Sequence, residues 1–201
     1  MLADAGYNLE EAPKLFEHLE IYIKDEEIKE GFFFSTHPHV AQRIKNYKQI
    51  IEDQYSDRIP VRESNPEYFN FAQEVTLTNT QLCLVQGMYK TAHRNIQDFI
   101  KQHPDSAEAY YYLGEIFRQR QDKSKKEKER DKLADYPEAL KAYQEAIAKD
   151  PNFALAYRGK GFVLQKQGQM EEAKKAFEDY LKYKPDAQDK SYIEEFLNES
   201  K

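Results

Sequence analysis

Apolar residues in the second half of the chain recur at fixed distances before a proline. In three stretches, apolar side chains lie twelve, eight and five positions ahead of it. Steps of three and four residues place side chains on one face of a helix, and a proline ends the helix that precedes it. The pattern therefore predicts three amphipathic helices. The stretches are Ala92-Ile96-Phe99-Pro104, Ala139-Tyr143-Ala146-Pro151 and Ala173-Phe177-Tyr180-Pro185.

A second set of positions precedes the last two stretches and predicts a partner helix for each. The small residues of both sets let two antiparallel helices approach closely, and the large ones fill the space to the next pair. Pro151 and Pro185 are 34 residues apart, whereas Pro104 and Pro151 are 47 apart, which is the same interval plus 13 residues. The second set comprises Tyr110, Leu113, Gly114 and Phe117, then Tyr157, Gly161 and Leu164.

These positions resemble tetratricopeptide repeats, which are helix–turn–helix units of 34 residues. The resemblance implies an all-α fold, a tetratricopeptide-repeat solenoid of antiparallel helix pairs preceded by a small helical segment. The first unit is degenerate, because Thr76 and Thr80 stand where an aromatic residue and a glycine are usual. The predicted repeat domain is 73–201, with repeats at about 73–106, 107–153 (insertion 118–133) and 154–187, and a capping helix at 188–198.

Residues 1–60 contain no repeat and are predicted to form two helices, joined to the repeats by a linker over 61–72. The first helix is predicted to start at Asn8, whose side chain can cap it. The second is predicted to begin near Pro38, since proline is favoured in a first turn. Their apolar faces are Leu15, Phe16, Leu19 and Tyr22 on the first, and Val40, Ile44, Tyr47 and Ile51 on the second.

Short motifs in this segment resemble the end of the catalytic domain of the zinc metallopeptidases of the HtpX, BepA and CaaX-prenyl-protease type. They are Ala5-Gly6-Tyr7-Asn8, Phe34-Ser35-Thr36-His37-Pro38 and Arg43-Ile44. In that family an "AGY" helix leads to an S-T-H-P loop and then to Arg-Ile on a closing helix. Members of the BepA type continue directly into tetratricopeptide repeats, as this chain does.

The chain departs from that family at the metal site. Such enzymes need H-E-x-x-H on one helix, because both histidines must face one metal. None of the five histidines here forms this motif, and the family's glutamate ligand would precede Met1. The sequence therefore predicts no catalytic residue, metal ligand or cofactor in this chain, and zinc only in a full-length parent. Whether the protein is an enzyme stays open.

The resemblance implies that His37 and Arg43 lie near the metal site of the complete enzyme, where His37 can approach the zinc. The alternative is that His37 only caps the helix at Pro38, with Thr36 as another candidate for that cap.

Repeat register places the first helices of each pair on the concave side of such a solenoid. The predicted partner-binding residues there are Tyr111, Glu115, Arg118, Arg158 and Phe162. Some modules of this family clamp a C-terminal carboxylate with lysines and asparagines. Here only Arg118 and Arg158 supply positive charge, so we expect an extended segment or a helix of a partner instead. The alternative is that Tyr111 and Phe162 only pack against neighbouring helices.

The chain is acidic as a whole but has one basic segment. The net charge of −6 argues against general nucleic-acid binding. The segment 118–133 has eight basic and four acidic residues, a local +4 that leaves −10 for the rest of the chain. It is either a solvated helix extension or loop, or a contact for an acidic partner or a lipid surface. The single cysteine, Cys83, excludes an internal disulfide.

Two functions from different classes follow. The first is a partner- or substrate-recruiting module at the C-terminal part of a bacterial envelope zinc metallopeptidase, periplasmic or at the cell envelope. The second is a stand-alone scaffold without peptidase activity. Both predict a protein or peptide partner and no nucleic acid; self-association is open, and membrane association would come only through the parent. No signal peptide follows Met1.

Overall fold

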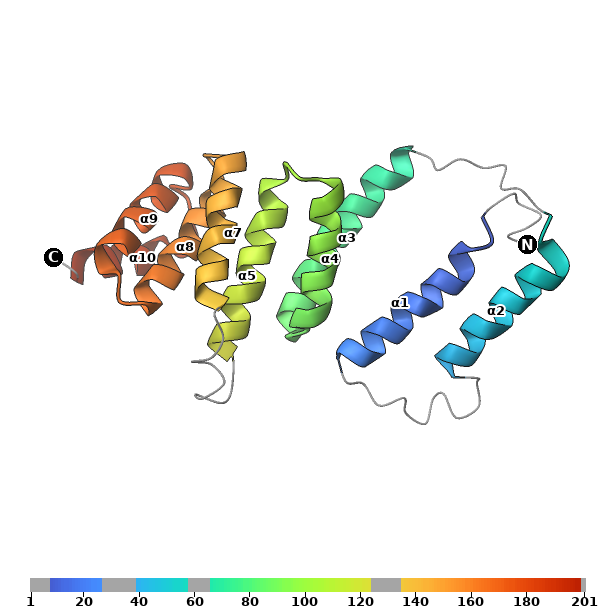
Figure 1. Cartoon of the computed structure of the whole chain (residues 1–201). Coiled ribbons are helices and arrows are strands. Elements are labelled where there is room, and N and C mark those ends of the chain that lie inside the picture. Colours follow the sequence, from blue (N-terminus) through green and yellow to red (C-terminus); the bar gives the residue numbers. More distant parts are fainter. Residues whose placement is uncertain (1–7, 27–38, 58–65, 124–134, 200–201) are drawn as a thin grey trace. The chain divides into compact units, whose positions relative to one another are not determined.

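The computed structural model describes residues 8–26, 39–57, 66–123 and 135–199, and all regular structure in these ranges is helical (Figure 1). The chain divides into two compact units, Met1–Ala72 and Gln73–Lys201, and the two are taken separately below. Among the described helices, none combines the length and the apolar character needed to cross a bilayer.

The first unit contains α1 (Glu11–Asp25) and α2 (Val40–Tyr55), which run antiparallel and pack against each other (Figure 1). The rings of Phe16 and Tyr47 stack with centroids 5.3 Å apart. The guanidinium of Arg43 lies 5.5 Å from the Phe16 ring centroid. Lys48 and Glu17 add an ion pair of 2.7 Å. An aromatic contact and an ion pair therefore join the two helices, and Val40 of α2 is buried.

Helix α1 begins later than the sequence predicts. The side chain of Asn8 accepts a hydrogen bond of 3.0 Å from the backbone N–H of Glu10, and the helix starts at Glu11. Asn8 thus forms a turn before the helix instead of capping it, because asparagine side chains bond readily to the backbone two residues on. Helix α2 begins at Val40, close to the predicted start, while Pro38 and His37 lie outside the described residues.

The second unit is a stack of helix pairs that alternate in direction. Helices α5 and α7, and α8 and α9, are the tightest pairs, and α10 packs on α9 (Figure 1). The predicted all-α stack is confirmed for the described residues. Its helices are α3 (Pro66–Gln86), which crosses the boundary between the units, α4 (Tyr89–Gln102), α5 (Ala107–Lys123), α7 (Asp135–Lys149), α8 (Ala154–Lys166), α9 (Met170–Tyr183) and α10 (Lys190–Glu199).

Two helices extend beyond their predicted ends. Helix α3 starts at Pro66, so most of the segment 61–72 predicted as a linker is helical; proline is well suited to a first helical turn. Helix α5 runs to Lys123 and so includes the first part of the predicted insertion 118–133. Residues 124–134 are outside the described ranges.

Glycines make the close packing of the stack possible. A Cβ at Gly114 would lie 2.5 Å from Cε1 of Tyr143, and one at Gly159 would overlap the same ring. A Cβ at Gly161 would lie 2.6 Å from Cε1 of Phe177. Since Tyr143 and Phe177 are fully buried, neither ring can move aside easily. The rings of Tyr143 and Phe177 therefore fill spaces that only glycine leaves on the first helices.

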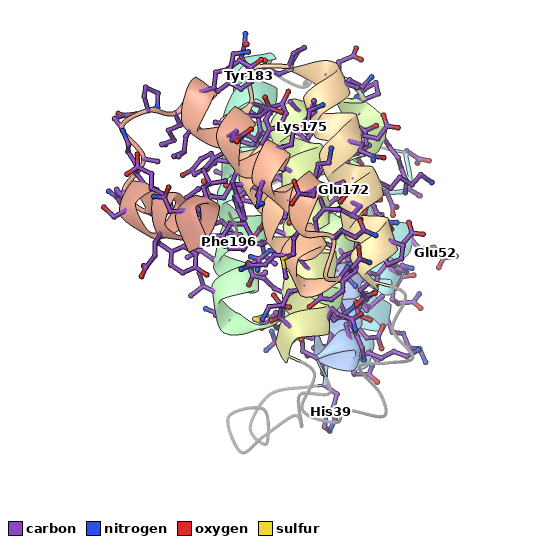
Figure 2. The ribbon with its side chains drawn as sticks, turned by 90° about the vertical axis from the view of Figure 1, so that its left-hand side faces the viewer. His39, Glu52, Glu172, Lys175, Tyr183 and Phe196 are labelled. Atoms are coloured by element: carbon purple, nitrogen blue, oxygen red, sulfur yellow. The ribbon has the colours of Figure 1, made fainter. Side chains whose placement is uncertain are left out.

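The exposed side of the second helices is polar. Figure 2 shows Glu172 and Lys175 on the outer surface of α9, and both are exposed. The buried residues of α9 are Ala173, Ala176, Phe177 and Tyr180. This division into an apolar inner face and a charged outer face is what a solvated repeat stack requires.

Candidate functional site

The five predicted partner-binding residues lie on α5 and α8, which are in contact with each other in the stack. We call the side of these helices that carries the five residues the first-helix face. The structure divides them into two groups with different surroundings. The members are Tyr111, Glu115 and Arg118 on α5, and Arg158 and Phe162 on α8.

Glu115 is buried and accepts hydrogen bonds from three side chains. Arg118 donates through Nε (3.0 Å) and Nη2 (2.6 Å), and Gln119 donates through Nε2 at 3.1 Å. The fourth bond comes from helix α7, where the hydroxyl of Tyr143 donates at 2.7 Å. Arg118 also reaches Asp122 at 3.1 Å. The carboxylate is therefore occupied within the protein and is not presented to solvent.

This network keeps Glu115 ionised in spite of its burial. Burial alone would raise the pKa of Glu115, but the hydrogen bonds and positive charge of Arg118, with the bonds from Tyr143 and Gln119, lower it. Burial alone would lower the pKa of Arg118, but the hydrogen bonds and the negative charge of Glu115 raise it. The pKa of Tyr143 is raised, chiefly by burial, so the hydroxyl remains a donor.

Tyr111 lies in an aromatic cluster beside this network. Its ring centroid is 5.3 Å from that of Tyr112, 5.6 Å from Phe153 and 6.3 Å from Tyr143. Burial, followed by the charge of Glu115, raises the pKa of Tyr111. Because Tyr111 remains partly exposed, its ring both packs internally and forms part of the surface.

The second group centres on Arg158, which is tied to the capping helix. Its Nε donates to Oδ2 of Asp189, the residue before α10, and the other oxygen of Asp189 accepts a bond of 2.7 Å from the Tyr180 hydroxyl. Burial would raise the pKa of Asp189, but the bonds from Tyr180 and Arg158 lower it. Burial and this bond raise the pKa of Tyr180 to about 12. Arg158 therefore holds α10 in place.

Phe162 joins α8 to the same end of the stack. The guanidinium of Arg158 lies 5.1 Å from the Phe162 ring centroid. Phe177 packs edge-on against Phe162 at 5.2 Å, and Tyr192 of α10 lies 6.4 Å away. Tyr192 is exposed, so the aromatic surface continues from α8 onto α10.

The chemistry of the first-helix face is aromatic and polar, with its arginine charges already offset. Arg118 pairs with Glu115 and Asp122, and Arg158 pairs with Asp189. Sequence reasoning identified the arginines but missed Asp189 and Asp122 as their partners. An aspartate just ahead of the capping helix is a recognisable helix-start signal for Asp189.

That His37 and Arg43 lie near the metal site of a complete enzyme stays a prediction. His37 lies outside the described residues, and Arg43 lies over Phe16. In the described parts of the chain, no three His, Cys, Asp or Glu side chains gather closely enough to hold a metal ion.

Sequence comparison identifies the stack. Three family models described as tetratricopeptide repeat match residues 84–125, 108–152 and 132–198. Residues 84–198 are tetratricopeptide repeats. Most of α3 precedes the matched tetratricopeptide segment, and the degenerate first unit stays a prediction. No match supports the resemblance of residues 1–60 to zinc metallopeptidases, which stays a prediction. A search of curated protein sequences gives no significant match.

Solved structures share the tetratricopeptide-repeat fold. The Arabidopsis OM64 TPR domain is 18% identical, with a TM-score of 0.52. The match covers 65% of this chain and 97% of the OM64 domain. The TPR2B domain of yeast Sti1, solved as a pHsp70 complex, is 19% identical, with a TM-score of 0.51 and coverages of 63% and 93%. The TPR2AB domain of Sti1, solved as a pHSP90 complex, is 15% identical, with a TM-score of 0.52 and coverages of 94% and 67%. At these identities the likeness shows the fold alone.

Proposed function

We propose that the tetratricopeptide repeats bind a protein partner through the first-helix face. The observation that carries this proposal is the placement of Tyr111 and Phe162, both partly exposed, on two helices in contact, with Tyr192 beside Phe162. Exposed aromatic side chains on a rigid helical scaffold supply large contact area at low entropic cost. Protein binding is also the role of the repeats in the two Sti1 complexes.

The charges on this face favour one kind of partner. Capturing a C-terminal carboxylate needs cations that are free to bind it. Arg118 and Arg158 are each within hydrogen-bond distance of an acidic side chain of the chain itself. Drawing either arginine away would leave Glu115 or Asp189 without its main partner. The favoured partner is therefore an uncharged or mixed segment with apolar side chains, not an acidic tail.

The test uses a peptide selected from a phage-displayed library on the full chain. Replacing Tyr111 and Phe162 by alanine should weaken its binding by about 2 kcal/mol or more per anchor. Since both rings also pack internally, the melting temperature of each variant is measured with the affinity. Tyr183→Ala is the matched control, because Tyr183 pairs with Tyr157 and neither residue is a proposed anchor.

Three results would contradict binding through the first-helix face. One is unchanged affinity in a folded double variant, which would direct attention to the basic segment 118–133. Another is equal loss of affinity in Tyr183→Ala. A large fall in melting temperature in the double variant, with the affinity of the remaining folded protein unchanged, would show that the rings only pack.

A finer proposal is that these repeats recruit substrates or partners for an envelope zinc metallopeptidase whose closing helices are α1 and α2. It rests on the motifs around Asn8, His37 and Arg43, and on α1 and α2 forming an antiparallel pair ahead of the repeats. The alternative is a stand-alone scaffold. The coding sequence upstream of Met1 distinguishes them: an in-frame H-E-x-x-H supports the peptidase and its periplasmic or envelope location, and a frame that begins at Met1 rejects it.

A further inference from the structure

The first helix of the stack carries apolar residues at positions that its equivalents bury. Val75 and Leu82 of α3 lie 34 residues before Ala109 and Ile116 of α5, and those lie 47 residues before Ala156 and Val163 of α8. The four residues of α5 and α8 are 0% exposed, because each packs in a core cluster with the preceding second helix. Val75 and Leu82 are 48% and 53% exposed. Helix α3 therefore has the face of a stacked helix without a cover from the described helices of the repeat unit.

This face is also free of charge in a highly charged chain. No charged residue occurs from Val75 to Tyr89, whereas charged residues make up 33% of the whole sequence. Val85, one further turn along, is 75% exposed. Solvated helix faces are normally charged, so an apolar and uncharged one marks a docking surface. We call Val75, Thr78, Asn79, Leu82 and Val85 the α3 stripe.

The opposite end of the stack is closed. Ile193 of α10 is fully buried, and the ring of Phe196, labelled in Figure 2, packs edge-on against Phe177 at 5.3 Å. The bond of Arg158 to Asp189 fixes the start of this helix. Figure 1 shows α3 and α10 at opposite ends of the stack. The repeat stack thus has one capped end and one uncapped end.

We propose that two copies of the chain associate through the α3 stripe, with the two α3 helices antiparallel across a two-fold axis. A stack with a single open end cannot build a filament, but the same surface on two copies closes a dimer. The stripe has the seven-residue spacing of a helix–helix seam, and α3 meets its copy as α5 and α8 meet their preceding helices. Val75 of one copy packs against Leu82 of the other.

Two further features favour a second copy as the occupant. Thr78 and Asn79 lie midway between Val75 and Leu82 and are exposed, so short polar side chains meet at the two-fold axis. There they can hydrogen-bond to their copies, and a polar pair of this kind fixes the register of a helix seam. The stripe has no charge, so the contact brings no like charges together although each copy carries −6. The inference does not depend on partner binding through the first-helix face, because none of the stripe residues belongs to that face.

Sedimentation equilibrium of the full chain tests the proposal. The parent should show a concentration-dependent monomer–dimer equilibrium, and Leu82→Glu should raise the dissociation constant at least about 100-fold by burying a charge in the contact. Met170→Glu is the matched control, since Met170 is an exposed apolar residue (44%) on α9, and it should leave the equilibrium unchanged. Circular dichroism should show equal helix content in all three.

Cysteine cross-linking tests the two-fold arrangement itself. Thr78→Cys should form a disulfide-linked dimer under mild oxidation, because the two copies of this position face each other near the axis. Gln97→Cys, on the exposed side of α4, should stay monomeric, and the native Cys83 is buried. A monomeric parent, as would result if residues 1–65 cover the stripe, would overturn the proposal. So would a Leu82→Glu variant that dimerises like the parent, or equal cross-linking at position 97.

Discussion

At the scale of single residues, a buried carboxylate organises the middle of the stack. Removing a charge from water costs several kcal/mol unless hydrogen bonds and an opposite charge replace the solvent. Glu115 has both, from Arg118 on its own helix and from Tyr143 on α7. Tyr143 in turn fits only because Gly114 and Gly159 leave room for its ring. Glycine, tyrosine and glutamate at these positions therefore depend on one another.

Tyr143→Phe should lower the free energy of unfolding by about 1 to 2 kcal/mol at neutral pH, because a buried acceptor loses one of its donors. The pKa of Glu115 in the folded chain is below that of an unfolded glutamate. Its ionised form therefore stabilises the fold above the unfolded pKa, and this contribution is lost as the pH falls through the folded pKa. The difference in the free energy of unfolding between the parent and Tyr143→Phe should then become smaller in acid. Urea denaturation over a series of pH values measures it.

Tyr157→Phe is the control for this prediction, because the hydroxyl of Tyr157 donates to the carbonyl of Pro151 at an exposed position. It should change the free energy of unfolding by much less than Tyr143→Phe, and by an amount that does not follow the protonation of Glu115. A cost for Tyr143→Phe that stays constant from neutral pH into acid would show that the hydrogen bond to Glu115 is not its source.

The sequence predicted the positions of Glu115 and Arg118 but not what they do. Helical register predicts that both lie on one side of a helix, and in the structure both are on α5, three residues apart. Their pairing depends on the rotamer of Arg118 and on a tyrosine 28 residues away, and neither follows from the spacing of apolar residues. Whether Glu115 also contributes to binding stays a prediction, and its burial limits it to a supporting role.

At the scale of helices, the capping helix is held by hydrogen bonds at its start and by apolar contacts along its length. Asp189 joins Arg158 to Tyr180 at the start of α10, and Phe196 packs on Phe177 along it. An aspartate at this place also favours the start of a helix. Repeat proteins need such a cap, because the last unit would otherwise expose its apolar face.

A double-mutant cycle on Arg158 and Asp189 should give a coupling energy of about 0.5 to 1 kcal/mol, since the pair is partly buried and solvent screens it only in part. Lys149 and Asp105 provide the control cycle, because their 2.8 Å ion pair includes an almost fully exposed aspartate. That cycle should give a coupling close to zero. Equal coupling in both cycles would mean that Arg158 and Asp189 form an ordinary surface ion pair without a role in holding α10.

The ends of the second helices were predicted well, because a proline follows each of them. Second helices end just before Pro104, Pro151 and Pro185 as expected, and Gly87 and Gly168 form the turns after α3 and α8 with φ of 76° and 74°. Two boundaries were missed, although Pro66 is a helix-start signal for one of them. Helix α3 begins before the repeat pattern starts, and α5 continues through charged residues that form helix as readily as loop.

At the scale of the whole molecule, the repeats are nearly one-dimensional. Each helix pair contacts mainly its neighbours, so the stability of the stack is a sum over units and the interfaces between them. This is why the period in the sequence sufficed to predict the architecture. Interactions at the open end, and the function of residues 1–60, do not follow from the period, because they depend on surfaces that the repeat pattern does not describe.

The repeats should therefore fold without the first 65 residues. A chain of residues 66–201 should show helical circular dichroism and one cooperative melting transition, because it contains every core cluster of the stack and its C-terminal cap. A chain that starts at residue 73, the predicted repeat boundary, should melt lower, since it cuts α3 inside the helix and removes the proline of its first turn. An unfolded 66–201 chain would show that the stack needs the N-terminal unit, and equal melting of the two chains would show that residues 66–72 add nothing to α3.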